Sequence, residues 1–483
     1  MAVLAMTARR IPVQFGPSSD TSQATQGGGT VIENAYVDIT VGGRSKYALT
    51  ADPGLRAWAQ VAPGKAGRGA YAFGNIVYAV FGEALYKVDV TGNSTQIGVV
   101  VGTAPVGFSQ NNKQPNPQIT ICADSAVYVL ENDVLTSIPR TVLPAGVHST
   151  VHMNGYTLFG VSDGRVFSSD ILSSTSINAL NFDTAQRSPD PGTKLFIVGE
   201  DLWYFGASSL EVFRYIGGLG FPFQRLQGVT LGEGGGCIAK NSVVIVDNAP
   251  FWITDKKMVA RASGYTPMRV STSAVEADID AAISAGISET IVGFSYALGG
   301  HQFYGLRCPL WCWVYDTMTQ TWHSKKSYLD RTWLGVGYVY AFGKHLVLGN
   351  ADGAIYEMAS SFQTEGGQPL IVKLLSRNVN TSPKRLICDA LYLDLQAGQG
   401  KADSIATEGV SPKVMLRVSR DGGETFGTVQ RHSIGRQGNY GHQVVFRRLG
   451  AANGHGFVFE VSLSSPVVRA VFSATADVRE CAA

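Results

Sequence analysis

The sequence predicts an all-β protein: a β-propeller of about six or seven degenerate blades, a C-terminal β-sandwich-like domain and an extended N-terminal arm. Three observations predict this fold class. Short apolar strands alternate with Gly, Asn and Asp turns in units about forty residues apart, the spacing of four-stranded blades. Only one segment has helical periodicity, and after Val379 the strands become longer and alternate more regularly.

The composition predicts short strands joined by tight turns and a surface that is polar through Ser, Thr, Asn and Gln. Charged residues make up 16% of the 483 residues, against about 25% in an average soluble protein. The 56 glycines and 19 prolines favour tight turns. A net charge of +2 gives no sign of a basic nucleic-acid-binding domain, so any contact with DNA must be local or geometric. We interpret the pairs Lys325-Lys326, Lys384-Arg385 and Arg447-Arg448 as solvated strand ends.

Cysteine spacing and hydropathy indicate a protein made in a reducing cytoplasm. The six cysteines are scattered rather than arranged as a disulfide framework, and we expect free thiols at Cys122, Cys237, Cys308, Cys312, Cys388 and Cys481. The apolar stretch before Arg9-Arg10 is too short for a signal peptide. No apolar run is long enough for a transmembrane helix, so we expect no membrane insertion.

We divide the chain into an arm with a first strand (1–50), a propeller (51–379) and a C-terminal β-domain (380–483). The first thirty residues are rich in Ser, Thr, Gln and Gly, and are expected either to stay mobile or to be ordered by a neighbouring subunit. The propeller strands are expected at 70–80, 84–88, 119–129, 134–135, 151–159, 165–167, 195–198, 202–205, 242–246, 250–253, 290–296, 302–306, 311–315, 332–340, 345–348 and 354–356.

One helix is expected, over 271–284, where Val275, Ile279 and Ile283 are spaced four apart behind Ser and Thr caps. A single helix in a chain of this length excludes doubly wound α/β folds. The strands of the last domain are expected at 386–395, 413–419, 443–448, 456–463 and 467–472, with a boundary at Pro383 and an insertion at 397–400.

Candidate reactive groups do not form a convincing site. Cys308 and Cys312, with His301 and His323 nearby, suggest zinc, but a second ligand pair is missing, so core thiols are the better interpretation. The Gly-rich run 232–237 lies between strands and does not open a helix, as a phosphate site would require. We therefore assign no catalytic, cofactor-binding or metal-binding residue.

The segment Ser419-Arg-Asp421-Gly-Gly-Glu-Thr425-Phe matches the Asp-box pattern of sialidases, and Arg10-Ile-Pro resembles their N-terminal arginine motif. The box occurs once, outside the propeller, and Arg10 precedes the first strand that the pattern predicts. Paired catalytic carboxylates cannot be identified. We interpret the box as a structural turn whose Asp and Ser side chains bond to turn amides.

A series of local patterns resembles the packaged-DNA stabilisation, or tail nozzle, proteins of short-tailed bacteriophages. Asp52-Pro-Gly-Leu55 followed by Gly82-Glu-Ala-Leu-Tyr-Lys87 is similar to the start and first blade of that family. The later matches, in chain order, are 205–213, 234–237, 251–253, 313–316 with Trp322, 348–356, 419–422, 433–440, 446–450 and 457–467. The order of these motifs carries the resemblance over roughly residues 50–475.

The resemblance implies a non-enzymatic structural protein of the virion tail. It implies a homohexameric ring that extends the DNA channel below the portal and adaptor rings, retains the packaged genome and releases it on infection. Tail fibre, spike or needle proteins would be distal partners, and genomic DNA would pass without sequence-specific contact. The alternatives are a monomeric propeller that binds carbohydrate or protein, a sialidase-like glycoside hydrolase, and a phage fibre, whose sequence would be more repetitive.

Overall fold

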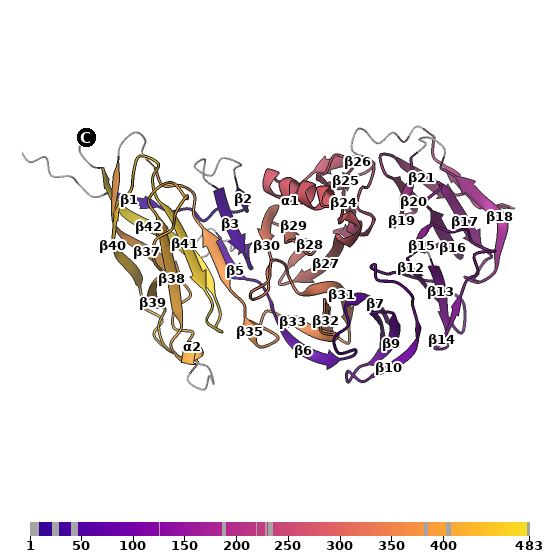
Figure 1. The fold of residues 1–483 in the computed structure, drawn as a ribbon, viewed down its shortest axis with the longest axis horizontal. Coiled ribbons are helices and arrows are strands. Elements are labelled where there is room, and N and C mark those ends of the chain that lie inside the picture. The colour runs from indigo at the N-terminus through magenta and orange to yellow at the C-terminus, as the bar shows by residue number, and fades with distance from the viewer. Residues whose placement is uncertain are drawn as a thin grey trace, which may run out of the picture.

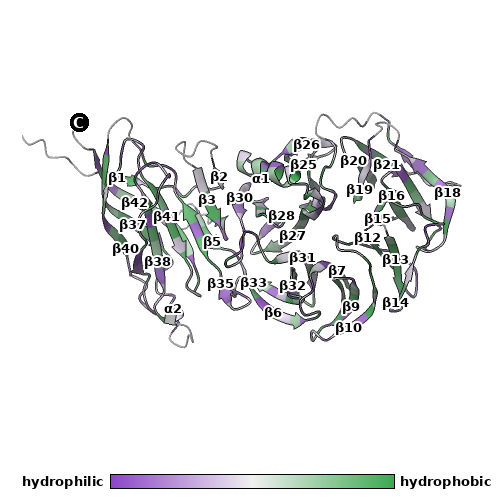
Figure 2. Ribbon diagram, in the orientation of Figure 1, coloured by the Kyte–Doolittle hydropathy of each residue, from purple (hydrophilic) through white to green (hydrophobic). Residues whose placement is uncertain are grey.

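A computed structural model describes residues 9–21, 29–39, 47–124, 126–185, 190–218, 220–227, 229, 235–380, 385–401 and 407–480. Two β-rich parts lie side by side, a propeller and a sandwich (Figure 1). The strands of both parts are rich in apolar residues (Figure 2). The predicted all-β class with a propeller and a C-terminal sandwich is confirmed.

Within the described residues, the propeller has seven four-stranded antiparallel blades. Blade 1 contains β7 (Gly67–Phe73), β8 (Ile76–Phe81), β9 (Ala84–Asp89) and β10 (Ser94–Val99), and blade 2 contains β11 (Gly107–Gln110), β12 (Ile119–Ala123), β13 (Ala126–Glu131) and β14 (Val134–Ser137). Blade 3 contains β15 (Val147–Met153), β16 (Tyr156–Val161), β17 (Arg165–Ser169) and β18 (Ile177–Thr184), and blade 4 contains β19 (Gly192–Val198), β20 (Asp201–Gly206), β21 (Leu210–Tyr215) and β22 (Phe223–Arg225). Blade 5 contains β23 (Val244–Val246), β24 (Ala249–Ile253), β25 (Val259–Ser263) and β26 (Thr266–Arg269), and blade 6 contains β27 (Val292–Leu298), β28 (His301–Arg307), β29 (Cys312–Asp316) and β30 (Thr321–Ser324).

Blade 7 closes the ring with strands from two distant parts of the chain. It contains β31 (Gly335–Ala341), β32 (Lys344–Gly349), β33 (Ala354–Ala359) and, as its outer strand, β6 (Gly54–Gln60), with the short β34 (Thr364–Glu365) and β35 (Gln368–Pro369) beside it. Strand β6 runs antiparallel to β33, and β31 lies against β7 of blade 1. Gly54 and Leu55 therefore complete the last blade, whereas the segment 82–87 lies in blade 1.

The second strand of each blade is buried because the neighbouring blades cover both of its faces. Every residue of β20 is buried, and in β8 five of the six residues are. In the outer strand β18 four of the eight residues are exposed and none is buried, since no described strand pairs with that edge. This difference explains why the continuous apolar runs of the sequence mark the middle strands.

The helix α1 (Ser273–Ser284) begins two residues after the start predicted for it. Val275 and Ile279 are fully buried against blades 5 and 6, as their spacing predicts. Trp313 donates from its indole nitrogen to the Asp278 carboxylate at 2.8 Å, which fixes the helix over blade 6. The other helical elements described are the short α2 (Thr407–Val410) and the 3-10 turns Lys240–Ser242 and Ser288–Thr290.

The sandwich consists of two sheets that share one hydrophobic core. One sheet has the order β4 (Ala35–Asp38), β5 (Ala48–Ala51), β42 (Ala470–Glu480), β37 (Leu386–Leu395) and β40 (Val444–Ala451), with β1 (Arg9–Pro12) also paired to β42. The other has the order β3 (Gly29–Glu33), β36 (Val372–Leu375), β41 (Val458–Leu463), β38 (Lys413–Ser419) and β39 (Gln430–Ser433), with β2 (Asp20–Thr21) paired to β3. Strand β3 also pairs with β30, so this sheet continues into blade 6.

The described part of the N-terminal segment is not a free arm. Strand β1 pairs with β42, and Val13 and Phe15 are buried in the sandwich core at 5% and 4% exposure. The expectation of an arm that is mobile or ordered by another subunit is therefore wrong for residues 9–21 and 29–30, which this chain orders itself. Residues 1–8 and 22–28 lie outside the described residues.

Candidate functional sites: the propeller channel and the propeller–sandwich seam

Three adjoining cavities of about 490, 420 and 340 Å³ follow the inner surface of the propeller. The first and second share Ser295 and Tyr338, and the second and third share Lys194 and Asn241, so they form one continuous space. Its walls come from the first strands of the blades, β7, β11, β15, β19, β23, β27 and β31. We call this space the channel.

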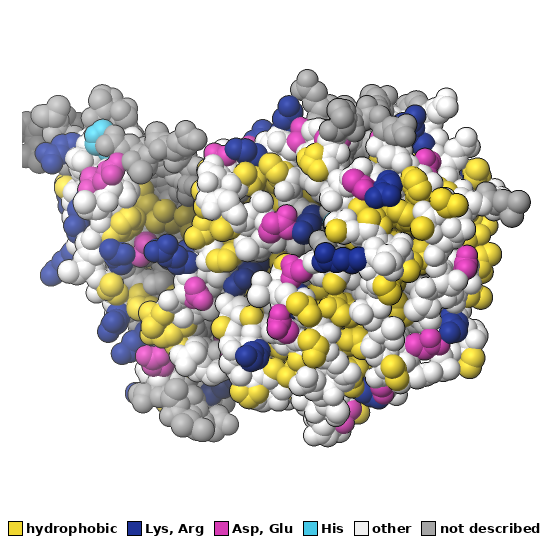
Figure 3. All heavy atoms as spheres, turned by 45° about the vertical axis from the view of Figure 1, so that its right-hand side comes forward, with side chains coloured by type: hydrophobic (Ala, Val, Ile, Leu, Met, Phe, Trp, Pro, Cys, Tyr) yellow, Lys and Arg dark blue, Asp and Glu magenta, His cyan; other side chains and the backbone are white. Residues whose placement is uncertain are grey.

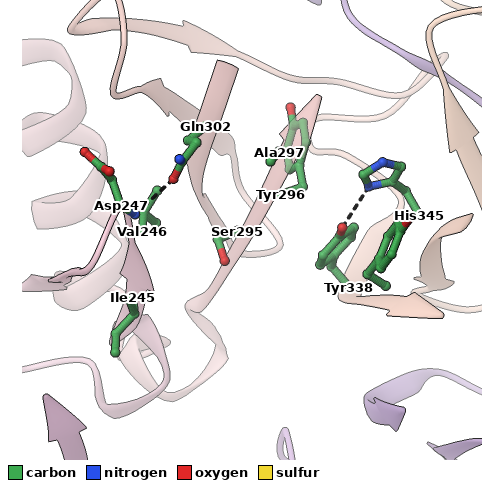
Figure 4. Close-up of a pocket in the computed structure, with 10 residues that line it drawn as sticks. Ile245, Val246, Asp247, Ser295, Tyr296, Ala297, Gln302, Tyr338 and His345 are labelled. Atoms are coloured by element: carbon green, nitrogen blue, oxygen red, sulfur yellow. Dashed lines mark hydrogen bonds between the residues drawn. The ribbon is translucent and has the colours of Figure 1, made fainter. Parts of the chain in front are cut away.

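One end of the channel is lined by the inner hairpins of blades 5, 6 and 7 (Figure 4). Tyr338 and His345 make a hydrogen bond of 2.8 Å between the phenol oxygen and Nδ1. On the opposite wall, the side-chain oxygen of Gln302 accepts a bond of 3.0 Å from the backbone N–H of Asp247. We call this end the mouth pocket; Ser295, Ala297 and the exposed Tyr340 also line it.

The middle of the channel carries cationic and polar groups. Lys240 forms an ion pair with Glu289, whereas Lys194 has no carboxylate partner among the described residues. Burial lowers the pKa of Lys194, and Lys240 adds to this effect. Burial also lowers the pKa of His148 to about 3, so this imidazole is neutral at neutral pH.

The thiols next to this part of the channel are not activated. Burial raises the pKa of Cys122 to about 11 and that of Cys237 to about 12. A thiol must lose its proton to act as a strong nucleophile, so both are unreactive at neutral pH. The polar groups that this part of the channel offers to a ligand are therefore Lys194, Lys240 and His148 rather than these thiols.

The second candidate site is the seam, which we define as Asn34, Asp52, His323, Lys325 and Glu365, where the sandwich meets blades 6 and 7. Asn34 lies between β3 and β4 with a φ of 57° and is fully buried. Its side chain donates to the carbonyls of Lys326 and Ile371 at 2.9 and 2.8 Å, and accepts from the Lys326 N–H at 2.9 Å. One asparagine thus connects the sandwich to both segments that leave the propeller.

Buried charges complete the seam. The Asp52 carboxylate lies 3.2 Å from His323 Nε2 and 3.9 Å from Lys325 Nζ. Burial alone would raise the pKa of Asp52, but His323 and Lys325 outweigh it and hold that pKa below its usual value. Lys325 also lies over the Trp333 ring at 4.6 Å, and the Trp333 indole donates to Glu365 at 2.9 Å.

The interpretation of Lys325 as a solvated strand end is wrong, since its side chain is fully buried and paired. Arg447 and Arg448 lie on exposed positions of β40, as expected, and Lys384 lies outside the described residues. The carboxylate partner of Lys325, Asp52, is far away in sequence, which is why the local pattern gave no signal for the seam.

The four residues considered for zinc are not brought together. Cys308 packs in the core between blades 5 and 6, and Cys312 in a different cluster facing blade 7, so the interpretation as core thiols is confirmed. His301 instead contacts Asp316 at 2.7 Å, and His323 contacts Asp52. Within the described ranges, no group of three or more His, Cys, Asp or Glu side chains could hold a metal ion.

The buried cysteines at the other predicted positions carry free thiols: Cys122, Cys237 and Cys388. Cys481 and residues 232–234 of the Gly-rich run lie outside the described residues. None of the helices in the part of the chain that the structure describes is both long and apolar enough to span a membrane.

The two sialidase-like motifs lie in the sandwich, away from the channel. Asp421 accepts bonds from the Ser419 hydroxyl at 2.6 Å and from the Thr425 N–H at 3.0 Å, as the structural-turn interpretation predicts. Arg10 pairs with Asp477 at 2.8 Å and stacks over Tyr392. Arg10 also lies within strand β1, so the expectation that it precedes the first strand is wrong.

The fold is that of a propeller–sandwich protein. A strand from the N-terminal part closes the seven-bladed propeller, and a shared sheet joins the propeller to the two-sheet sandwich. The chain belongs to the bacteriophage P22 Gp10 family. The family's β-propeller model matches residues 9–363, and its β-sandwich model matches residues 372–477. The resemblance found in the sequence is confirmed, and the protein is a phage structural protein of the tail and head-stabilisation class.

Several solved structures are similar to the chain at very low identity. The WD40 propeller of Doa1 is 10% identical over 63% of this chain and 97% of its own, with a TM-score of 0.40. Virginiamycin B lyase from Staphylococcus aureus is 9% identical over 64% and 99%, with a TM-score of 0.43. The designed protein Ika8 is 11% identical over 63% and 99%, with a TM-score of 0.38. No curated protein sequence matches the chain.

Proposed function

We propose that the protein is a nozzle subunit of a short phage tail, where a homohexameric ring extends the DNA channel below the portal and adaptor rings. The ring would retain the packaged genome and release it on infection. The observation that carries this proposal is the match of successive P22 Gp10 propeller and sandwich models over residues 9–363 and 372–477.

The connection between the propeller and the sandwich supports a role as a rigid subunit of a ring. A subunit that holds packaged DNA must not flex between its parts. Here, the shared sheet from β30 to β3, the three bonds of Asn34 and the buried Asp52 pairs all cross the boundary. Breaking buried pairs of this kind costs several kcal/mol, so the geometry favours a rigid subunit.

The outer face of the propeller supports contacts with neighbouring subunits. Apolar side chains are spread over this face in Figure 3. On blades 2 and 3, Leu180 is 81% exposed, Val134 64% and Ile171 60%. Strand β18, which carries Leu180, is also an unpaired sheet edge eight residues long. Exposed apolar edges are disfavoured in a monomer and are commonly covered in assemblies.

The charge distribution suits DNA that passes without sequence-specific contact. The net charge is +2, and several of the exposed cations are paired with acids, such as Arg10 with Asp477 and Arg56 with Glu357. A weakly charged surface provides few phosphate contacts and therefore little resistance to ejection. Fibre, spike or needle proteins would bind the distal end.

Immunogold labelling of intact virions, followed by cryo-EM of the labelled particles, tests the proposal. We expect label only at the tail, and a ring of this chain around the DNA channel. Label confined to the capsid, or virions that lack the chain, would overturn it.

A surface variant tests the lateral contact. Leu180→Glu should leave folding unchanged but prevent incorporation into tails, because a buried unpaired carboxylate is costly. Val429→Glu, at a 46% exposed position of the sandwich, is the matched control and should be incorporated normally. Normal incorporation of Leu180→Glu would exclude blade 3 from the subunit contact.

A further inference from the structure

The mouth pocket is built from the tips of three neighbouring hairpins. Asp247 and Asn248 form the turn of blade 5 with φ values of 49° and 56°, and Phe342 and Gly343 form that of blade 7 with 57° and 71°. Two consecutive positive φ values define tight turns that match the twist of the strands. The hairpins therefore end abruptly, and their last side chains surround one space of about 490 Å³.

Cross-strand pairing places the side chains that face this space. In blade 7, Tyr340 is directly opposite His345, and in blade 6, Ala297 is directly opposite Gln302. The small Ala297 side chain leaves the floor of the pocket open between these pairs. Figure 4 shows Gln302 and Asp247 on one side of the pocket, with Tyr338 and His345 on the other.

One wall carries hydrogen-bonding groups whose capacity is not used by the chain. Gln302 uses its oxygen to accept from the Asp247 N–H, so its amide NH₂ group is left without a partner among the described residues. The Asp247 carboxylate forms a long ion pair of 3.7 Å with Arg261, which leaves lone pairs on its oxygens for a ligand hydroxyl. The Ser295 hydroxyl makes no hydrogen bond within the described chain either. This wall therefore offers two donors and a strong acceptor.

The opposite wall is aromatic and neutral. The Tyr340 side chain is 57% exposed, and its ring meets that of His345 edge to face at 5.1 Å. Burial lowers the pKa of His345, so the imidazole is neutral at neutral pH. Whichever tautomer makes the bond with Tyr338, this pair keeps one further donor and one further acceptor.

The chemistry of these walls selects among ligand classes. No Lys or Arg lines the pocket, and the nearby Arg261 is already paired with Asp247, so phosphates and other anions find no cation there to bind. An apolar ligand would leave the Gln302 amide desolvated without a partner. A pyranose ring fits both walls, because its C–H face can lie on an aromatic ring while its hydroxyls donate and accept at the edge.

We propose that the mouth pocket binds one pyranose ring of a neutral glycan. Tyr340 provides the stacking surface, Asp247 and Gln302 bind neighbouring hydroxyls, and Ser295 and His345 complete the edge. The volume lies within the range of small-ligand sites, about 300–1,000 Å³. This inference does not depend on the position of the protein in the tail, and either proposal can fail without the other.

Saturation-transfer-difference NMR on the full chain tests the proposal with methyl glycosides of glucose, galactose, mannose and N-acetylglucosamine. Each is used at about 10 mM, which saturates a site whose dissociation constant is about 1 mM. We expect at least one glycoside to receive saturation at its ring protons. No signal from any of the four would overturn the proposal.

Variants locate the site. Tyr340→Ala should weaken binding of the glycoside that gives the signal by about tenfold, since the stacking surface is lost. Tyr340→Phe should keep most of the binding, and Gln302→Leu should weaken it through the lost donor. Tyr440→Ala is the matched control, because Tyr440 is 71% exposed on the sandwich. Equal binding by Tyr340→Ala and wild type, with unchanged melting, would overturn the assignment.

Discussion

The propeller and the sandwich are built from the chain in opposite ways. Each of blades 1 to 6 is formed by one continuous segment, so its strands meet across short turns. The sandwich instead joins β1–β5 from the beginning of the chain to β36–β42 from its end. The sandwich therefore depends on pairing between residues far apart in sequence, whereas most of the propeller depends on pairing between strands that are adjacent in sequence.

This difference can be measured because the tryptophans report on one part only. All seven tryptophans, Trp58, Trp203, Trp252, Trp311, Trp313, Trp322 and Trp333, belong to the propeller or to the boundary with it. Tryptophan fluorescence therefore follows unfolding of the propeller. Hydrogen exchange of residues 386–480, read by mass spectrometry, follows unfolding of the sandwich.

The largest effect is expected from the N-terminal part of the sandwich core. The double variant Val13→Ala/Phe15→Ala removes two side chains that are 5% and 4% exposed in that core. Cavities of this size should lower the free energy of unfolding of the sandwich by about 5 kcal/mol. Urea titration with hydrogen exchange should show early opening of 386–480, while tryptophan fluorescence changes later.

The matched control is Val429→Ala/Val468→Ala, at sandwich positions that are each 46% exposed. We expect a change of less than about 0.5 kcal/mol there. If the core variant behaved like this control, residues 13 and 15 would not belong to the fold of the sandwich.

The sequence predicted the local part of the architecture and missed the long-range part. Blade strands could be located because short apolar runs and turn residues lie next to one another, as in 76–89. The N-terminal strands could not, because β1 and β3 are stabilised by partners more than three hundred residues away. A segment rich in Ser, Thr and Gln has little to bury alone, and only the sandwich supplies its core.

The same limit applies to the candidate sites. The tight turns of the mouth pocket are visible as Asp-Asn, Gly-Gly and Phe-Gly pairs, but the sequence gives no sign that three hairpins converge. Lys325 looks like an exposed cation because its partner Asp52 precedes it by more than two hundred residues. The interpretation of the Asp box as a structural turn was correct, because its hydrogen bonds join residues that are close in sequence.

The second-largest loss of stability is expected at the seam between the propeller and the sandwich. Asn34→Ala removes three hydrogen bonds that cross between the two parts and places alanine, which tolerates the left-handed region less well than asparagine, at a φ of 57°. We expect a loss of about 4 kcal/mol, since two carbonyls are left unpaired and the backbone is strained. The fluorescence and exchange transitions should then separate along the urea axis.

Asn154→Ala is the control for backbone strain alone. Asn154 has a φ of 49° on an exposed turn of blade 3. It should cost about 1 kcal/mol and leave the two transitions coincident. Equal behaviour of the two variants would show that the bonds of Asn34 do not couple the parts.

Asp52→Asn should have a smaller effect and a distinct pH dependence. The amide cannot balance Lys325, so we expect a loss of about 3 kcal/mol at neutral pH. The pKa of Asp52 is held below its usual 3.8 in the folded protein. Its contribution is therefore complete above that value and is lost as the pH falls through the folded pKa.

Urea titrations of wild type and Asp52→Asn from pH 7 to pH 3 check this sign. The difference between their free energies of unfolding should stay constant down to about pH 5 and shrink below about pH 4. A difference that is independent of pH over the whole range would show that the Asp52 charge does not stabilise the seam.

The smallest effect is expected at the Asp box, where every bond is local and one sheet is involved. Asp421→Ala removes the acceptor of the Ser419 hydroxyl and the Thr425 N–H, bonds that lower the pKa of Asp421. The site is partly exposed to water, so the loss should be about 1 kcal/mol. Hydrogen exchange near 413–425 should rise while tryptophan fluorescence stays unchanged, because no contact across the seam is touched. Asp421→Asn, which keeps an acceptor, should recover part of the loss. A fluorescence shift as large as that of Asn34→Ala would mean that even local turns of the sandwich stabilise the propeller, and the contrast between the two parts would fail.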